Sequence, residues 1–379
     1  MKFFADITAQ NYKHGQRICG DAFACERDER GVVFIICDGI GSGMYANIAA
    51  ISCVSRLKEL LSRGVSLRAA AEMVAASMHK AREAEIPFAA FCAAAISPDG
   101  HYSVYTYESP APIRIADGVA EALAPEFYTA GYEVVGEASG LLENGDGLLL
   151  FSDGVSQAGL GHGYAWGIGP DGVAAFVNKE LAAGCQAAEL PAAINTMSAA
   201  ISGGRYEDDT TCALLHCREA AELIILTGPP SRAAKDSEFV AEFMARPGRK
   251  AVCGSTTTEI AARELHREAR LCPVDQSFGS PPEYRIEGID LATEGAVMLN
   301  QAYNLLDEPL ENLGGGVVER LCAMMHQADA IHFMLGGAVN AAHGGLLFKQ
   351  IGMLPRKKAV GLIAEKLKSL GKLVIVRTY

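Results

Sequence analysis

Two short apolar runs in this chain each end in an aspartate that is followed by glycine. They are residues 32–39 (VVFIICDG) and residues 147–154 (GLLLFSDG). Uninterrupted apolar runs of this length are typical of strands buried on both faces. A glycine directly after the strand allows a tight turn and lets another backbone segment come close. The pattern therefore predicts two interior strands that deliver Asp38 and Asp153 to one sheet edge.

The sequence around these runs predicts an α+β domain over residues 1–218. Helical periodicity covers residues 44–63 and 66–83, and two strand-like runs flank the turn at residues 98–100, which predicts a hairpin. Two more helices are expected near residues 170–183 and 187–201. Because antiparallel strands come first and helices lie between and after them, we expect two antiparallel sheets in layers with helices.

Residues 219–379 predict a second, smaller domain of the α/β class. Apolar strand-like runs alternate there with helical stretches, which favours a parallel, Rossmann-like sheet. The expected strands are 222–227, 250–253, 330–335 and 372–377, and the expected helices are 256–270, 293–306, 316–328 and 356–370. A Pro/Gly-rich stretch occupies residues 273–288.

Composition excludes several classes of protein. The formal net charge of -12 argues against a surface for nucleic acid or anionic membrane, since both require a basic face. The 11 cysteines are odd in number and contain no CxxC pair, which indicates reduced thiols and a cytoplasmic protein. The first residues lack the apolar region of a signal peptide, and no apolar stretch approaches the roughly 20 residues that span a bilayer.

Four aspartates have positions that suit metal binding. Asp21 lies in CGDAF, Asp38 and Asp153 end the two apolar runs, and Asp208 begins DDTT before a further strand. Each alone is more typical of a turn or a helix cap. Together they offer the oxygen ligands that Mg²⁺ and Mn²⁺ prefer, whereas no His/Cys cluster has the spacing of a zinc site.

Three segments in this order resemble one known family. They are GDAFACERDERGVVFIICDGIGSGMYAN, ENGDGLLLFSDGVSQAG and DDTTCALL, within residues 14–217. They are similar to the type 2C metal-dependent serine/threonine phosphatases, and within them to the SpoIIE-type branch. The resemblance implies a β-sandwich flanked by helices with two Mn²⁺ or Mg²⁺ ions at one end. It also implies hydrolysis of phosphoserine or phosphothreonine on a partner protein.

The same resemblance assigns roles to individual residues. Asp38 would bridge the two metals with the carbonyl of Gly39 as a further ligand, while Asp153 and Asp208 would hold the other ion. Asp21 would lie near the centre, and act through a water. A water activated between the ions would attack phosphorus directly, without a covalent phosphoenzyme.

Several nearby residues have less defined roles in this reading. Arg17 stands close to where related phosphatases carry a phosphate-binding arginine, although the local spacing differs. His14 and His162 have the reactivity of a proton donor to the leaving alkoxide, but surface or structural roles are more typical of such histidines. Asp209 is interpreted as a neighbour of the ligand Asp208.

The C-terminal half leaves more than one interpretation open. Its segments CGSTTTEIAARELHRE and EGIDLATEG resemble bacterial phosphatases of this branch thought to accompany iron-only hydrogenases. Gly228-Pro229-Pro230 and residues 253–256 both follow predicted strands. Thr256 with Glu259 fits a capping box, and the alternative is an anion or nucleotide seat at a helix N-terminus. The domain is expected either to bind a small ligand or to serve dimerisation or partner docking.

Three functions remain open at this stage. The leading one is an active phosphoprotein phosphatase. The second is a regulatory protein that binds a phosphoprotein without turnover, which the complete set of four aspartates disfavours. The third is a metal-dependent hydrolase of small phosphate esters.

Overall fold

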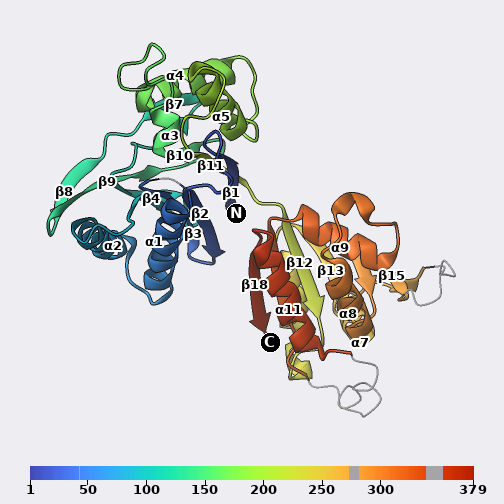
Figure 1. Cartoon of the computed structure of the whole chain (residues 1–379). Helices are drawn as coiled ribbons and strands as arrows, with labels where there is room; N and C mark the ends of the chain where they lie inside the picture. The colour runs from blue at the N-terminus through green and yellow to red at the C-terminus, as the bar shows by residue number, and fades with distance from the viewer. Residues whose placement is uncertain (42, 273–280, 339–352) are drawn as a thin grey trace. The chain divides into compact units, whose positions relative to one another are not determined.

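The computed structural model describes residues 1–41, 43–272, 281–338 and 353–379. The chain divides into two compact units (Figure 1). The first comprises Met1–Glu26 and Arg30–Glu219, and the second comprises Ala220–Tyr379 together with Arg27–Glu29.

The first unit contains a six-stranded antiparallel sheet in the order β2-β3-β4-β5-β9-β8. Its strands are β2 (Asp21–Asp28), β3 (Gly31–Gly39), β4 (Ala89–Ile96), β5 (His101–Tyr107), β8 (Glu126–Ala130) and β9 (Glu133–Leu141). Helices α1 (Met44–Ser62) and α2 (Leu67–Glu83) pack against this sheet. The hairpin expected around residues 98–100 is β4 and β5, with Ile96 opposite Tyr102.

A second antiparallel sheet of the first unit has the order β1-β11-β10-β6-β7. Its strands are β1 (Lys2–Asn11), β6 (Ile113–Ala116), β7 (Val119–Ala122), β10 (Gly147–Phe151) and β11 (Thr210–Glu219). Helices α4 (Gly169–Ala182) and α5 (Leu190–Ile201) pack against it, and the one-turn helix α3 (Asp153–Ser156) follows β10.

The apolar run in β3 is continuous because both faces of the strand are buried. Phe34 and Ile36 pack with Leu148 and Leu150 of the other sheet, whereas Ile35 and Cys37 pack with α1 and α2. Successive side chains of a strand point to opposite faces, so a strand between a sheet and a helix layer needs apolar residues throughout. The unit is thus two antiparallel sheets between helical layers, which confirms the α+β fold expected from the sequence.

The second unit is built on a mixed seven-stranded sheet with the order β14-β15-β16-β13-β12-β17-β18. Five strands are parallel: β12 (Glu222–Thr227), β13 (Arg249–Cys253), β16 (Leu291–Thr293), β17 (Ala330–Leu335) and β18 (Leu373–Thr378). The short strands β14 (Arg270–Leu271) and β15 (Glu283–Arg285) extend one edge in the antiparallel sense.

Helices cover both faces of this sheet. Leu223 and Ile225 of β12 pack with α8 (Ala296–Leu305), α9 (Val317–Gln327) and α11 (Arg356–Ser369). Ile224 and Leu226 of the same strand face α6 (Asp236–Ala245) and α7 (Ser255–Glu264). The described part of this unit also contains two 3-10 turns, Ala233–Lys235 and Leu310–Asn312. In the ranges that the structure describes, no helix has the length and apolarity that crossing a bilayer requires.

Three sequence expectations for the second unit need correction. Helix α6 was not expected, although Phe239 and Phe243 bury one face of it. Helix α7 ends at Glu264 instead of continuing to 270, and the chain turns at His266, whose φ is 52°. The predicted capping box of Thr256 and Glu259 is also wrong, because the N-cap is Gly254 and no side chain caps the helix. Residues 273–280 of the Pro/Gly-rich stretch lie outside the described residues.

Candidate metal centre

The fold places Asp38 at the end of an interior strand. Asp38 is the penultimate residue of β3 and lies opposite Ala90 of β4. The following residue, Gly39, is held close to the first turns of α1. A Cβ on Gly39 would lie 1.9 Å from the carbonyl oxygen of Ala46, so no other residue fits there without moving the helix. The glycine therefore fixes the distance between the carboxylate strand and α1.

Asp153 reaches the same region from the other sheet, so the prediction that both aspartates lie at one sheet edge is wrong. It is the first residue of α3, separated from the end of β10 by Ser152, and its Oδ2 accepts a 2.7 Å hydrogen bond from Nε2 of Gln157. Gly154 allows the segment that precedes β11 to come close, because a Cβ there would lie 2.1 Å from the carbonyl oxygen of Asp209. This contact holds the ends of β10 and β11 together, and with them Asp153 and Asp208.

Asp21 is the most buried of the four carboxylates, with 3% of the residue exposed. The hydroxyl of Thr211 donates a 2.7 Å hydrogen bond to its Oδ2, while its Oδ1 is buried and has no hydrogen-bond partner among the described residues. The pKa of Asp21 is raised to about 6, chiefly by burial and also by the charges of Asp209 and Asp153, against the effect of hydrogen bonds from Thr211 and Ser152.

Asp38 is surrounded by the other carboxylates. Burial raises the pKa of Asp38 well above its usual value, and the charges of Asp21, Asp153 and Asp208 add to the effect. The pKa of Asp208 is also raised, first by burial and then by Asp153, and Lys13 opposes the shift. The four aspartates expected from the sequence are therefore brought together into one mutually repelling group.

Asp209 differs from its neighbour Asp208. Its Oδ1 accepts a 2.9 Å hydrogen bond from the backbone N–H of Lys13, and its Oδ2 accepts a 2.7 Å hydrogen bond from that of Gly20. Both oxygens are thus occupied in joining β11 to the segment between β1 and β2. This arrangement supports the interpretation of Asp209 as a neighbour of the site.

The donor set fits a hard divalent cation. All four side chains offer carboxylate oxygens, and Oδ1 of Asp21 is a buried acceptor without a donor. Within the ranges described by the structure, no group of three or more His, Cys, Asp or Glu side chains is arranged so that it could hold a metal ion. The carboxylates interact through their charges, and cations would relieve that repulsion.

Lys13 is a cation of the site that the sequence did not indicate. Its Nζ lies 3.3 Å from Oδ1 of Asp208. Arg17 is exposed and forms no hydrogen bond or ion pair within the described part of the chain. His14 is also exposed, and its backbone N–H donates to the carbonyl of Tyr206. The structure therefore brings Lys13, but neither Arg17 nor the His14 side chain, into recorded contact with a site carboxylate.

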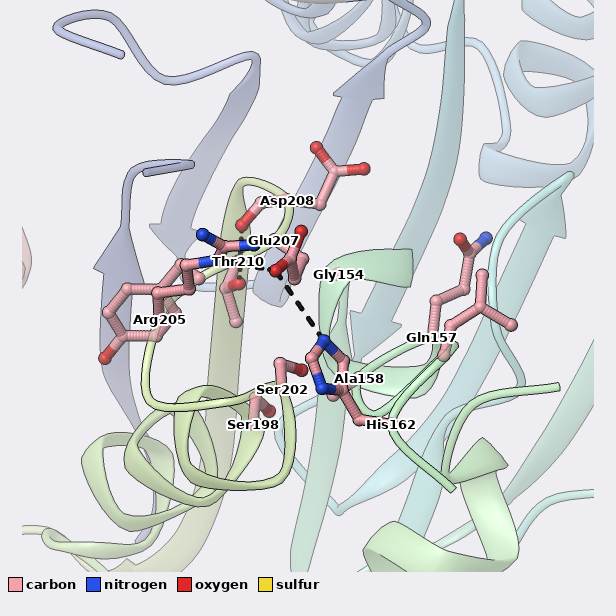
Figure 2. A pocket seen from close by; sticks show the side chains of 12 residues that line it. Gly154, Gln157, Ala158, His162, Ser198, Ser202, Arg205, Glu207, Asp208 and Thr210 are labelled. Carbon is pink, nitrogen blue, oxygen red and sulfur yellow. Dashed lines mark hydrogen bonds and ion pairs between the residues drawn. The ribbon is translucent and has the colours of Figure 1, made fainter. Parts of the chain in front are cut away.

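A polar pocket of about 360 Å³ adjoins Asp208 (Figure 2). Nε2 of His162 points across it to Oε1 of Glu207 at 3.8 Å. Ser202 shapes the floor by accepting a 2.9 Å hydrogen bond from the N–H of Gly159. The pocket is lined by Gly154, Gln157, Ala158, Leu160, His162, Ser198, Ser202, Arg205, Tyr206, Glu207, Asp208 and Thr210.

A family model described as Stage II sporulation protein E (SpoIIE) matches residues 28–218, which is half of the chain and contains Asp38, Asp153 and Asp208. The chain belongs to the SpoIIE family. This confirms the resemblance drawn from the three sequence segments at the level of the family. No curated protein matches the sequence.

Several solved structures are similar to this member of the SpoIIE family at low identity. The phosphatase domain of Bacillus subtilis SpoIIE with a fragment of its regulatory domain is 19% identical with a TM-score of 0.48, and the match covers 57% of this chain and 64% of that chain. The RsbU and RsbW domains of a Mycobacterium tuberculosis protein are 16% identical with a TM-score of 0.48, over 63% of this chain and 67% of that one. RsbX in complex with magnesium is 17% identical with a TM-score of 0.42, over 56% and 98%.

Two features of the site escaped sequence reasoning for different reasons. Thr211 follows the DDT segment, so its proximity to the aspartates was visible, but its hydrogen bond to Asp21 depends on the pairing of distant strands. Lys13 carries no local signal, because a lysine after a strand is typical of any solvated surface. His162 was considered for its reactivity alone, and the pocket shows its surroundings.

Proposed function

We propose that the first unit is a metal-dependent serine/threonine protein phosphatase. The observation that carries the proposal is the grouping of Asp21, Asp38, Asp153 and Asp208. Burial and neighbouring carboxylates raise the pKa values of Asp21, Asp38 and Asp208. Shifts of this kind at convergent groups are typical of functional sites. Membership of the SpoIIE family supports the same activity.

In this proposal the carboxylates of Asp38, Asp153 and Asp208 and the carbonyl of Gly39 hold two Mn²⁺ or Mg²⁺ ions, and Asp21 acts from behind them. Two such ions supply a water that is nucleophilic near neutral pH and neutralise charge on phosphoryl oxygens. Thr211 orients Asp21 through its 2.7 Å hydrogen bond. Asp209 keeps the chain segment of Asp208 in place through two backbone amides.

Two further residues have proposed roles around the substrate. Lys13, beside Asp208, is placed to contact a phosphoryl oxygen, and we assign it this role alongside the exposed Arg17. His162, in the pocket with Glu207, is positioned to orient the substrate residue that carries the phosphate or to protonate its leaving oxygen. Each of these two roles can be tested by a single substitution.

Hydrolysis of a phosphothreonine peptide by the purified chain tests the proposal. Activity that requires Mn²⁺ or Mg²⁺ and disappears with EDTA supports it. A chain that binds a phosphopeptide but releases no phosphate with either ion would instead be a regulatory binding protein.

A second candidate is a hydrolase of small phosphate esters. The pocket of about 360 Å³ beside Asp208 favours it, because this volume lies within the range of small-molecule sites. Turnover of a nucleoside monophosphate faster than that of a phosphopeptide would establish this alternative.

The remaining features of the chain stay proposals. We propose that residues 1–218 and 219–379 act as separate functional domains, and that the second is Rossmann-like. Its parallel strand order β16-β13-β12-β17-β18 and its helices on both faces support that class. A cytoplasmic location, a homodimer and an association with iron-only hydrogenases rest on the sequence alone.

A further inference from the structure

The second unit contains a cation, Arg356, that none of the described residues pairs with. Arg356 is the first residue of α11, and its guanidinium lies against the backbone of Gly228, where a Cβ would be 2.1 Å from Nη1. Its Nε is buried without a hydrogen-bond partner, and no ion pair of Arg356 occurs among the described residues. Burial lowers the pKa of Arg356, and the nearby thiol of Cys253 opposes the shift. An unpaired, largely buried guanidinium is costly, so its presence calls for a reason.

Arg356 lies where an open parallel sheet offers a binding site. Strands β13 and β16 follow on one side of β12, whereas β17 and β18 lie on the other. The strand order therefore reverses between β12 and β17. Ligands of such sheets bind outside the carboxyl ends of the strands at this reversal, and Gly228 directly follows β12 there.

Glycines bring the backbone of neighbouring loops into contact at this edge. A Cβ on Gly336, after β17, would lie 2.2 Å from the carbonyl oxygen of Gly228. A Cβ on Gly295, after β16, would lie 3.2 Å from Cα of Gly254. Close packing explains these glycines. It does not explain the charge of Arg356, because close packing of backbone does not require a charged side chain.

Two helices begin at the same edge with unusual first turns. Helix α7 starts at Ser255 after Gly254, with no side-chain cap, no acidic residue in its first turn, and Ser255 and Thr256 exposed. Helix α11 has Arg356, Lys357 and Lys358 in its first turn and again no acidic residue. The helix dipole disfavours cations at that end. Basic residues at the positive end of a helix dipole are locally unfavourable, and such unfavourable arrangements are expected at functional sites.

We propose that this edge of the second unit binds a phosphate group of a small molecule, with Arg356 as its main ligand. The planar guanidinium matches phosphate oxygens with two parallel hydrogen bonds. The uncapped N–H groups of α7 and the hydroxyls of Ser255 and Thr256 complete a site for an anion, as helix N-termini commonly do. Arg356 would then face a negative charge, which the described residues do not supply.

Binding of inorganic phosphate to the full chain tests this site, measured by calorimetry in EDTA at constant ionic strength. EDTA removes cations that would hold phosphate at the carboxylates of the first unit. Arg356→Gln should weaken binding by about tenfold or more, and Arg356→Lys by less, because lysine keeps the charge but loses the fork. Lys357→Gln is the matched control: it removes the same charge one residue further on, from an exposed side chain, and should retain most of the affinity.

Hydrogen exchange locates the bound ion. Phosphate should protect the amides of residues 255–257 in the wild-type chain and not in Arg356→Gln. Without phosphate, Arg356→Gln should be at least as stable as the wild type, whereas a purely structural arginine would lose stability on substitution. The same titration with adenosine monophosphate distinguishes the two ligands. Tighter binding of adenosine monophosphate than of phosphate would identify the ligand as a nucleotide. The proposal is overturned if the wild type binds neither, or if Arg356→Gln binds as well as the wild type.

Discussion

Gly154 lies so close to the backbone of Asp209 that a Cβ on it would be 2.1 Å from the Asp209 carbonyl oxygen. The glycine after the aspartate thus has a packing role besides its role in the turn. It lets two sheet-edge segments meet, and these segments carry Asp153 and Asp208.

Gly154→Ala should therefore destabilise the first unit and separate its carboxylates. The contact is with backbone, which cannot rotate away, so we expect a loss of about 2 kcal/mol or more in the free energy of unfolding. Chemical denaturation followed by circular dichroism measures it. Gly361→Ala, at an open position in α11, should instead leave stability unchanged or raise it. Equal effects of the two substitutions would show that the close contact does not matter.

Asp38→Asn should stabilise the metal-free protein. The pKa of Asp38 and that of Asp21 are raised in the folded state, so the native protein binds protons more tightly than the unfolded chain. Its stability then falls as pH rises through these pKa values, and removing one carboxylate relieves the repulsion. Thermal unfolding in EDTA between pH 5 and 8 should show a smaller decline with pH for the variant. Addition of Mn²⁺ should raise the melting temperature of the wild type far more than that of Asp38→Asn.

The adjacent residues Asp208 and Asp209 should respond differently to the same change. Asp208→Asn should lose metal affinity and activity with little change in stability. Asp209→Asn should destabilise the fold by about 2 kcal/mol, because both oxygens of its carboxylate accept backbone N–H groups and an amide side chain satisfies only one of them. Metal titration and denaturation of both variants give the comparison. A reversal of the two effects would move the metal ligand from Asp208 to Asp209.

Lys13→Gln should lower kcat/KM for a phosphopeptide by about tenfold, as expected for loss of a charge-assisted hydrogen bond. Arg17→Gln is the comparison, because Arg17 is the other cation proposed to contact the phosphate, and the substitution removes the same charge from an exposed position of the same segment. If the Arg17 variant loses more activity than the Lys13 variant, the phosphate contact belongs to Arg17, as the family resemblance implied.

The sequence predicted the layered fold and the group of aspartates because both depend on short-range patterns. The run of residues 32–37 is apolar throughout since one face of β3 meets a sheet and the other a helix layer. Its end at Asp38-Gly39 marks the sheet edge. These signals need no knowledge of distant partners.

Features that depend on pairing between distant segments were not predictable in this way. The hydrogen bond from Thr211 to Asp21 joins residues 190 positions apart, and the approach of Lys13 to Asp208 spans 195. Helix α6 was missed because its apolar face is short, resting on Phe239, Val240 and Phe243 between acidic residues. The predicted capping box is wrong because the N-cap is Gly254, with a φ of 142°, which lies two residues before Thr256.

The most direct test of the phosphatase proposal is phosphate release from a phosphothreonine peptide by the wild type, Asp38→Asn and Asp117→Asn. Asp117 is the control, because it carries the same chemical change in a turn at a φ of 50°, which asparagine adopts readily. The account predicts turnover with Mn²⁺ or Mg²⁺ in the wild type and Asp117→Asn, none with EDTA, and none in Asp38→Asn despite a folded protein. Full activity in Asp38→Asn, or undiminished activity in EDTA, would contradict it.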